Sequence, residues 1–171
     1  MVYFLVSAEM KGSEPQIMNW FQTIDPQDIT PARAGNIPKW TRLPMKNGTI
    51  FPDILTMPCL LVSSMVHGVL RLYDPQIQYK RIVLFERSKQ GRALYYLPIL
   101  PDCDCLLPES ELSVDKSKIL RGVIDLAKTD RRPVIKLDGV TTSHVAFRLD
   151  VVESILRRDA KGMKLTELEI R

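Results

Sequence analysis

The sequence has few of the features that mark a secreted, membrane-bound or catalytic protein. Its 171 residues include three cysteines, an odd number that is too small for a disulfide scaffold and favours reduced thiols in the cytoplasm. No apolar run approaches the roughly 20 residues of a membrane span. The opening stretch MVYFLVSAEMKG lacks a basic start and a small-residue cleavage site, so it predicts a strand and not a signal peptide.

Catalytic and nucleotide-binding motifs are also missing. The sequence contains no G-x-S-x-G, no G-x-G-x-x-G and no Walker A stretch. The net charge of +4 is a mild excess, and the absence of a dense basic run with interleaved aromatic residues disfavours a nucleic-acid partner. We therefore expect no enzyme, no metal and no cofactor, and a function carried by the exterior of the protein.

What is present fits one α+β domain over residues 1–171, with a largely antiparallel sheet and about two main helices. Six prolines from Pro15 to Pro52 disfavour long elements in that region. Residues 1–56 are therefore expected to form a proline-rich wrap around a core of sheet and helices at 57–171. A short helix is expected over 15–21. Large side chains are expected to hold the wrap against the core: Trp20, Phe21, Ile24, Ile37 and Trp40.

Two helices and a hairpin give the clearest local signals. A helix is expected from Ser63 or Ser64, either of which can cap it, to Asp74-Pro75, which ends it. Two β-rich runs around a glycine-containing turn predict a hairpin within 78–99. A second helix is expected after Asp150, with a capping box formed with Glu153. Further strands are expected at 2–7 and 59–62, within 113–128, and at 133–139, 144–150 and 164–170.

The stretch PDCDCLLPES at 101–110 raises the question of a metal or redox site. Structural zinc sites commonly use C-x₂₋₄-C pairs and four ligands, whereas Cys103 and Cys105 are one residue apart and no second pair follows. Carboxylates beside a thiol raise its pKa by like-charge repulsion, which disfavours redox chemistry. We expect one of the two cysteines to face inward and the aspartates to face water.

Charge is laid out in two neighbouring segments of opposite sign. The segment 102–115, the acidic loop, has no lysine or arginine and carries Asp102, Asp104, Glu109, Glu111 and Asp115. The segment 78–92, the basic hairpin, has one acidic residue, Glu86, and carries Lys80, Arg81, Arg87, Lys89 and Arg92. Exposed segments on a rigid scaffold often carry recognition. The acidic loop is the first candidate contact surface and the basic hairpin the alternative, with Trp40 as a buried aromatic anchor.

Several short motifs follow one another along the chain in a characteristic order. They are F-x-D-I-L with a proline, a V-S junction between strand and helix, an aromatic-rich hairpin before P-x-x-D-C, and a final L-D-x-x-E-S-x-L-R-R-x-x-x-G. This arrangement resembles a family of bacterial immunity proteins from polymorphic-toxin systems. The N-terminal Q-I-x-N-W followed by an Ile-Asp pair resembles the Gram-positive members of that family. The resemblance implies a cytoplasmic protein that binds a cognate toxin domain and blocks it, without a catalytic residue of its own.

We therefore expect an immunity protein that neutralises a toxin by non-covalent occlusion. Two other classes stay open. One is a small enzyme with a Cys/His or Ser/His site around Cys59, Ser64 and His67. The other is a homo-oligomeric accessory protein, and a homodimer is left open in each case.

Overall fold

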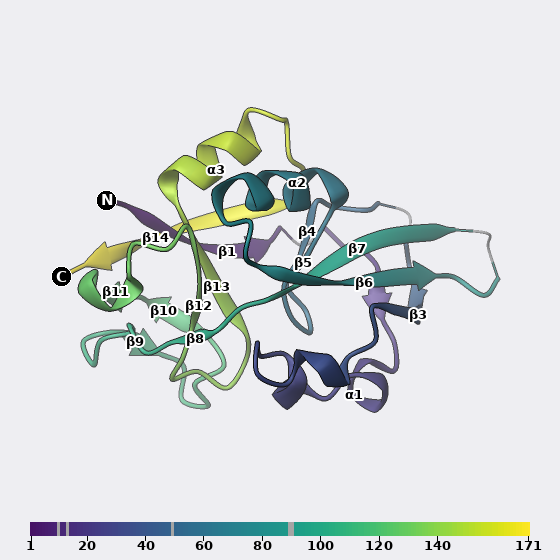
Figure 1. Cartoon of the computed structure of the whole chain (residues 1–171), viewed down its shortest axis with the longest axis horizontal. Helices are drawn as coiled ribbons and strands as arrows, with labels where there is room; N and C mark the ends of the chain where they lie inside the picture. Colours follow the sequence, from purple (N-terminus) through teal and green to yellow (C-terminus); the bar gives the residue numbers. More distant parts are fainter. Residues whose placement is uncertain (10, 13, 49, 89–90) are drawn as a thin grey trace.

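The frame of the protein is a pair of six-stranded sheets (Figure 1), seen in a computed structural model that describes residues 1–9, 11–12, 14–48, 50–88 and 91–171. The first sheet consists of β1 (Tyr3–Ala8), β8 (Asp102–Cys103), β11 (Val123–Ile124), β12 (Val134–Leu137), β13 (His144–Arg148) and β14 (Met163–Ile170). The second consists of β2 (Gln16–Ile17), β3 (Trp40–Lys46), β4 (Ile54–Leu55), β5 (Leu61–Val62), β6 (Gln78–Phe85) and β7 (Arg92–Ile99).

Helices and short turns complete the fold. The α-helices are α1 (Trp20–Thr23), α2 (Ser64–Tyr73) and α3 (Leu149–Leu156), and the 3-10 turns are η1 (Pro26–Asp28), η2 (Ala34–Asn36) and η3 (Ala127–Thr129). A separate pair of strands, β9 (Glu111–Leu112) and β10 (Ile119–Arg121), forms a small ribbon. In the described part of the chain, every helix is too short or too polar to cross a membrane.

Both sheets are mixed, so the expected α+β architecture is present but the sheet is less antiparallel than predicted. The strand order is β11-β14-β1-β13-β12-β8 in the first sheet and β2-β3-β6-β7-β5-β4 in the second. β3 with β6, β8 with β12, and β11 with β14 are parallel pairs. A parallel pair needs a long crossover between its strands, and the crossover from β3 to β6 contains β4, β5 and α2.

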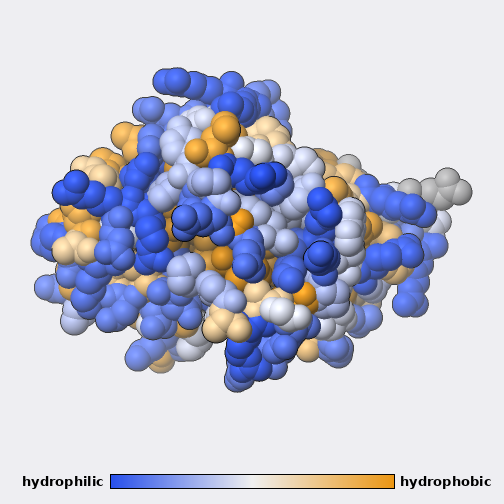
Figure 2. Space-filling view, viewed as in Figure 1, coloured by the Kyte–Doolittle hydropathy of each residue, from blue (hydrophilic) through white to orange (hydrophobic). Residues whose placement is uncertain are grey.

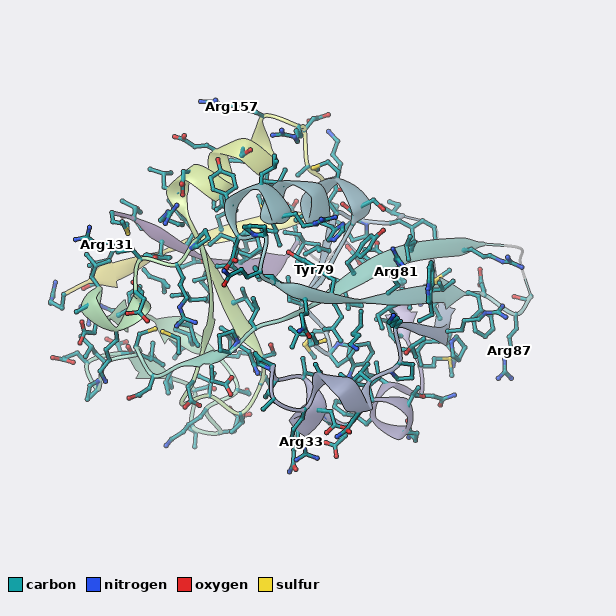
Figure 3. The ribbon with its side chains drawn as sticks, viewed as in Figure 1. Arg33, Tyr79, Arg81, Arg87, Arg131 and Arg157 are labelled. Atoms are coloured by element: carbon teal, nitrogen blue, oxygen red, sulfur yellow. The ribbon has the colours of Figure 1, made fainter. Side chains whose placement is uncertain are left out.

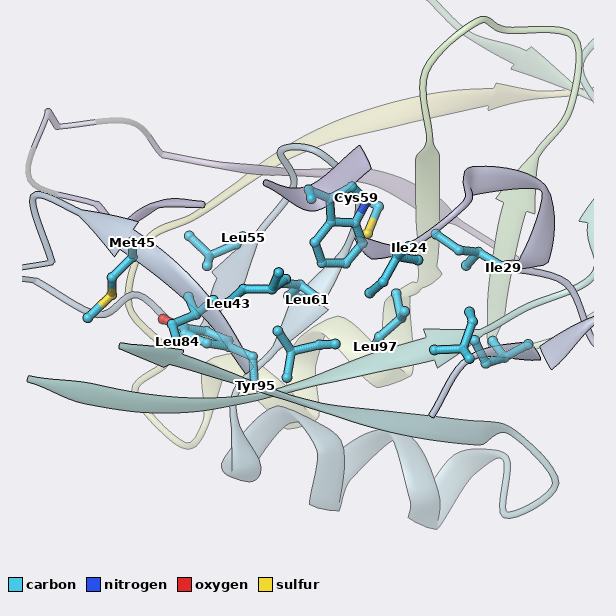
Figure 4. Close-up of a cluster of buried hydrophobic side chains, with 14 of the residues drawn as sticks. Ile24, Ile29, Leu43, Met45, Leu55, Cys59, Leu61, Leu84, Tyr95 and Leu97 are labelled. Carbon is cyan, nitrogen blue, oxygen red and sulfur yellow. The ribbon is translucent and has the colours of Figure 1, made fainter. Parts of the chain in front are cut away.

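Three clusters of buried apolar side chains hold these elements together. The first lies between the second sheet and the segment around α1 (Figure 4). The second lies beneath α2 and α3, which contact each other, and the third occupies the opposite face of the first sheet. Successive strand residues point to opposite faces, so β1 sends Leu5 to the third cluster and Val6 to the second.

The proline-rich segment differs from the expected wrap in two ways. β3 lies inside the second sheet, and the helix predicted over 15–21 is wrong, because β2 pairs there with β3 and the helix begins only at Trp20. β1 confirms the strand predicted at 2–7. Asn19, with a φ of 59°, separates the two elements. Trp20 is buried as expected, but Phe21 and Trp40 are 67% and 53% exposed. Trp40 is therefore not a buried anchor.

The two longer helices begin differently from one another. Ser63 caps α2 by accepting a hydrogen bond from the N–H of Val66 at 3.4 Å, and the helix ends before Asp74, as predicted. The capping box predicted for the second helix is wrong, because Asp150 lies inside α3. Its carboxylate accepts two hydrogen bonds from the Arg148 guanidinium, both at 2.7 Å, so Arg148 takes the oxygens that a capping box would use.

A hydrogen-bonded junction at Asp53 ties the two sheets to α2. The Asp53 carboxylate accepts from the Ser63 hydroxyl at 2.6 Å and from the backbone N–H of Lys161 at 2.7 Å. The Asp53 N–H donates to the Lys161 carbonyl at 2.9 Å, and the Ser63 N–H donates to the Asp53 carbonyl at 2.8 Å. Asp53 precedes β4 of the second sheet and Lys161 precedes β14 of the first. One carboxylate therefore fixes both sheets and the start of a helix.

Close packing at Gly162 completes this junction. Gly162 has a φ of +75°, and a Cβ at this position would lie 2.4 Å from the Cβ of Pro52. The Pro52 carbonyl accepts a hydrogen bond from the buried Tyr95 hydroxyl at 2.7 Å. Pro52, Asp53, Ser63 and Gly162 all belong to the motifs that carry the family resemblance, so in this structure those motifs meet at one structural joint.

We expect Asp53→Ala to destabilise the protein by about 3 kcal/mol, since two hydrogen bonds to a charged acceptor are lost at a part-buried position. Asp25→Ala is the matched control, because among the described residues the Asp25 carboxylate accepts from the N–H of Gln27 alone, in an exposed turn, and its loss should cost about 1 kcal/mol. Urea unfolding followed by circular dichroism measures both. Equal losses for the two variants would contradict the role assigned to the junction.

Gly162→Ala should cost about 3 kcal/mol or more, because the new methyl group adds a steric clash to an unfavourable backbone conformation. Gly139→Ala separates the two effects. Gly139 has a φ of +84° and nothing within 4 Å of its ideal Cβ, so only the backbone cost of about 1 kcal/mol remains. The same unfolding experiment compares the pair, and a Gly162 variant no less stable than the Gly139 variant would refute the close approach.

Candidate functional site

The acidic loop is partly neutralised by cations from later segments of the chain. Its ion pairs are Asp102 with Lys136 at 2.8 Å, Asp104 with Lys128 at 3.1 Å, and Glu111 with Arg121 at 3.7 Å. These cations lie on β12, η3 and β10, well after the loop in the sequence. Two carboxylates of the loop are therefore paired with lysines in the folded chain, while Glu111 shares Arg121 with Glu169, which Arg121 approaches more closely at 2.6 Å.

The two remaining carboxylates of the loop differ from each other. Asp115 accepts hydrogen bonds from the Ser113 hydroxyl at 2.6 Å and from the Ser117 hydroxyl and N–H at 2.8 and 3.1 Å. These bonds, that from Ser113 first, lower the pKa of Asp115 to about 2. Asp115 thus organises its own turn. Only Glu109 of the five is exposed without an ion pair or hydrogen bond to another described residue.

The cysteines of the DCDC stretch both face inward, so the expectation that only one is buried is wrong. Cys103 and Cys105 belong to the third cluster with Tyr3 and Ile135. Burial, and then a hydrogen bond with Cys103, raises the pKa of Cys105. Among the residues that the structure describes, no three His, Cys, Asp or Glu side chains come together as metal ligands would.

The basic hairpin forms part of a wider surface on the second sheet. Leu43, Ile82 and Tyr95 of β3, β6 and β7 point into the first cluster, so the residues between them point the other way. α2 covers that outer side over β5 and near Tyr96 of β7. On β3, on β6 and at the hairpin end of β7 the same side carries Trp40, Arg42, Arg81, Phe85 and Arg92, which we call the basic face.

Two arginines of the basic face stack on its aromatic rings. The Arg81 guanidinium carbon lies 4.6 Å from the centroid of the Trp40 ring, and the Arg42 guanidinium carbon lies 5.2 Å from that of Phe85. Cation–π contact of this kind holds a guanidinium in place while leaving its N–H groups exposed. The face therefore presents ordered cations next to aromatic surface.

The cations of the basic face lack acidic partners within the described ranges. Arg42, Arg81 and Arg92 are exposed, and none forms an ion pair there. Figure 2 shows hydrophilic side chains gathered where β6 and β7 extend toward their turn, and Figure 3 places Arg81 on β6 and Arg87 near the turn. Lys89 lies outside the described residues.

The basic face differs from the predicted basic hairpin in two ways: it excludes Lys80 and it includes residues of β3. Lys80 alternates with Arg81 and so leaves β6 on the opposite side of the sheet. Arg42 and Phe85 were missed as surface residues. The period-two pattern of WTRLPMK at 40–46 signals a strand with Trp40 and Arg42 on one side, but Pro44 led to the prediction of an irregular segment.

The residues of the predicted enzyme site are not brought together. Cys59 lies in the first cluster on the inner side of the second sheet, whereas His67 contacts Tyr96 on the outer side. The His67 ring stacks on that of Tyr96 at 3.9 Å, and Ser64 is exposed at the start of α2. Cys59 and His67 therefore lie on opposite sides of the second sheet, and no hydrogen bond joins Ser64 to His67 among the described residues.

We expect the three thiols to be inert in the folded protein. Burial raises the pKa of Cys59 to about 12, so roughly one thiol in 10,000 is ionised at pH 8. An aromatic disulfide reagent at pH 8 should release almost no colour from native protein and three equivalents in denaturant, matching the three free cysteines. Rapid labelling of any one thiol in native protein would contradict the burial described for it.

Comparison with known proteins gives no matching family model and no matching curated relative. The surface geometry of this chain and the motifs of its sequence are therefore what bear on its function. In that geometry the acidic loop is compensated by ion pairs, whereas the basic face has no such compensation among the described residues.

Proposed function

We propose that this chain is an immunity protein that neutralises a cognate bacterial toxin by non-covalent occlusion, and that the basic face is its contact surface. The observation that supports the proposal most directly is the pair of exposed arginine–aromatic stacks, Arg81 on Trp40 and Arg42 on Phe85. Tryptophan and arginine are the residue types most enriched in the energetic centres of protein interfaces.

The rigidity of the basic face also supports a role in binding. β6 and β7 are paired over eight positions from Gln78–Ile99 to Phe85–Arg92, and β3 adds a parallel neighbour. Side chains on such strands lose little freedom on binding, which improves affinity because less entropy is lost. The acidic loop meets this condition less well, since its carboxylates are already used in ion pairs.

The charge of the basic face defines the expected surface of the toxin. A standard interface covers roughly 800 Å² on each partner, enough to include the basic face and the nearby part of α2. Unpaired guanidinium groups favour a partner surface with carboxylates, which speeds the encounter and selects against basic partners. Occlusion would then be steric, with complementary charge setting the orientation of the toxin.

Charge reversal on the basic face should abolish protection. We expect Arg42→Glu and Arg81→Glu each to weaken toxin binding by about 100-fold, as loss of an interface centre does. The assay is growth of a bacterial host that expresses the toxin domain encoded beside this chain, with affinity measured by calorimetry. Arg157→Glu is the matched control, because Arg157 is exposed at the end of α3, far from β6 (Figure 3).

Four results would count against the proposal. No rescue of growth by the unmodified chain would refute the immunity role. Full rescue by Arg42→Glu and Arg81→Glu would move the contact surface elsewhere, and loss of rescue with Glu109→Lys would return it to the acidic loop. Self-association by light scattering, without binding to the neighbouring gene product, would favour the accessory-protein class.

A further inference from the structure

A hollow opens between α2 and β6, beside the basic face. Its volume is about 420 Å³, and its lining includes Lys39, His67, Arg71, Tyr79, Arg81 and Tyr96. Arg81 belongs both to this hollow and to the stack on Trp40. The hollow therefore continues the basic face toward α2, and its rim is open because Arg71 and Arg81 are exposed.

Three aromatic rings make a firm wall for the hollow. The His67 and Tyr96 rings stack with centroids 3.9 Å apart and planes 3° from parallel, and Tyr79 meets His67 edge-on at 4.4 Å. The Tyr79 hydroxyl is buried and finds no hydrogen-bond partner in the described part of the chain. Tyr79 therefore contributes its ring to the wall of the hollow, while its hydroxyl lies beneath the surface.

Positive charge dominates the hollow. Lys39, Arg71 and Arg81 form no ion pair with any described residue. Burial, and then the charges of Arg71 and Arg81, lower the pKa of His67, so both guanidiniums act on this ring. Burial, and then the charge of Asp74, raise the pKa of Tyr79. The Asp74 carboxylate accepts a hydrogen bond from the backbone N–H of Gln76 at 3.1 Å.

We propose that this hollow is an oxyanion-binding site and that it receives a carboxylate from an acidic segment of the protein partner. Guanidinium groups bind carboxylates and phosphates through paired N–H donors, and Arg71 and Arg81 present two such groups at the rim of the hollow. An acidic protein segment fits better than a free metabolite, because the hollow is open and continuous with the basic face, whereas small-molecule sites usually enclose their ligands.

Only the identity of the partner rests on the proposed function, so the site can be tested without any toxin. The chain has two histidines, and the second, His144, is held by Thr142 and the Ser117 carbonyl in the first sheet. Histidine ring NMR therefore gives one probe in the hollow and one internal control. The ligand for the test is a blocked tetraglutamate peptide, titrated into the purified chain at low salt.

We expect the peptide to shift the His67 ring signals and to leave those of His144 unchanged. The pKa of His67 should also rise toward its ordinary value, because the bound carboxylates offset the charges of Arg71 and Arg81. Arg71→Gln and Arg81→Gln should each weaken the peptide by about tenfold, whereas Arg157→Gln should leave its affinity unchanged. Both sites are exposed, and thermal unfolding verifies that the variants remain folded.

Parallel titrations with inorganic phosphate and with a single-stranded oligonucleotide identify the source of the anion. Tighter binding of either one than of the peptide, with the same loss in the Arg71 and Arg81 variants, would overturn the assignment to an acidic protein segment. No His67 shift with any of the three ligands would overturn the site itself. If the peptide shifts the His67 signals but the chain does not rescue growth, the site stands and the immunity role is rejected. If the chain rescues growth but the peptide shifts nothing, the immunity role stands and the site is rejected.

Discussion

The hydrogen bonds of one carboxylate, Asp53, underlie the arrangement of the two sheets. This group accepts from the hydroxyl that caps α2 and from a backbone N–H just before β14. Because Gly162 lies against Pro52 without room for a side chain, the two chain segments approach at their backbones. Ser63 and Gly162 are separated in the sequence from Pro52 and Asp53 and meet them at this joint, so their spacing reflects a requirement of the fold.

The Asp53 joint also determines which part of the second sheet α2 leaves uncovered. α2 is fixed over the second cluster and covers the sheet near Tyr96, while the sheet beyond it stays open toward the hairpin. Strand alternation then places Arg42 and Arg81 on the open side and sends Leu43 and Ile82 inward. The alternation of side chains along the strands thus produces both the packed first cluster and the ordered arginines on the outer side of the sheet.

Local patterns predicted the elements that local physics determines. The cap at Ser63, the end of α2 before Asp74 and the hairpin were all foreseen, because each depends on residues within a few positions of one another. The parallel strand pairs were not foreseen, since they join distant segments and leave no nearby signal. The capping box failed for a similar reason: the side chain of Arg148 competes for Asp150, and spacing alone does not reveal such competition.

The difference between local and long-range contacts also explains why the sequence favoured the acidic loop as a binding surface. Counting charges within a window assigns it a strong negative field, but Lys128 and Lys136 reach it from segments that follow it in the chain. Ion pairs consume charge of both signs equally, so the net charge of +4 must remain on cations that folding leaves unpaired. The basic face and the adjoining hollow hold several of these cations, of which Arg42 and Arg81 stack on aromatic rings. A partner that neutralises them gains ion pairs without breaking any that the chain already makes, which is the physical reason to expect recognition there.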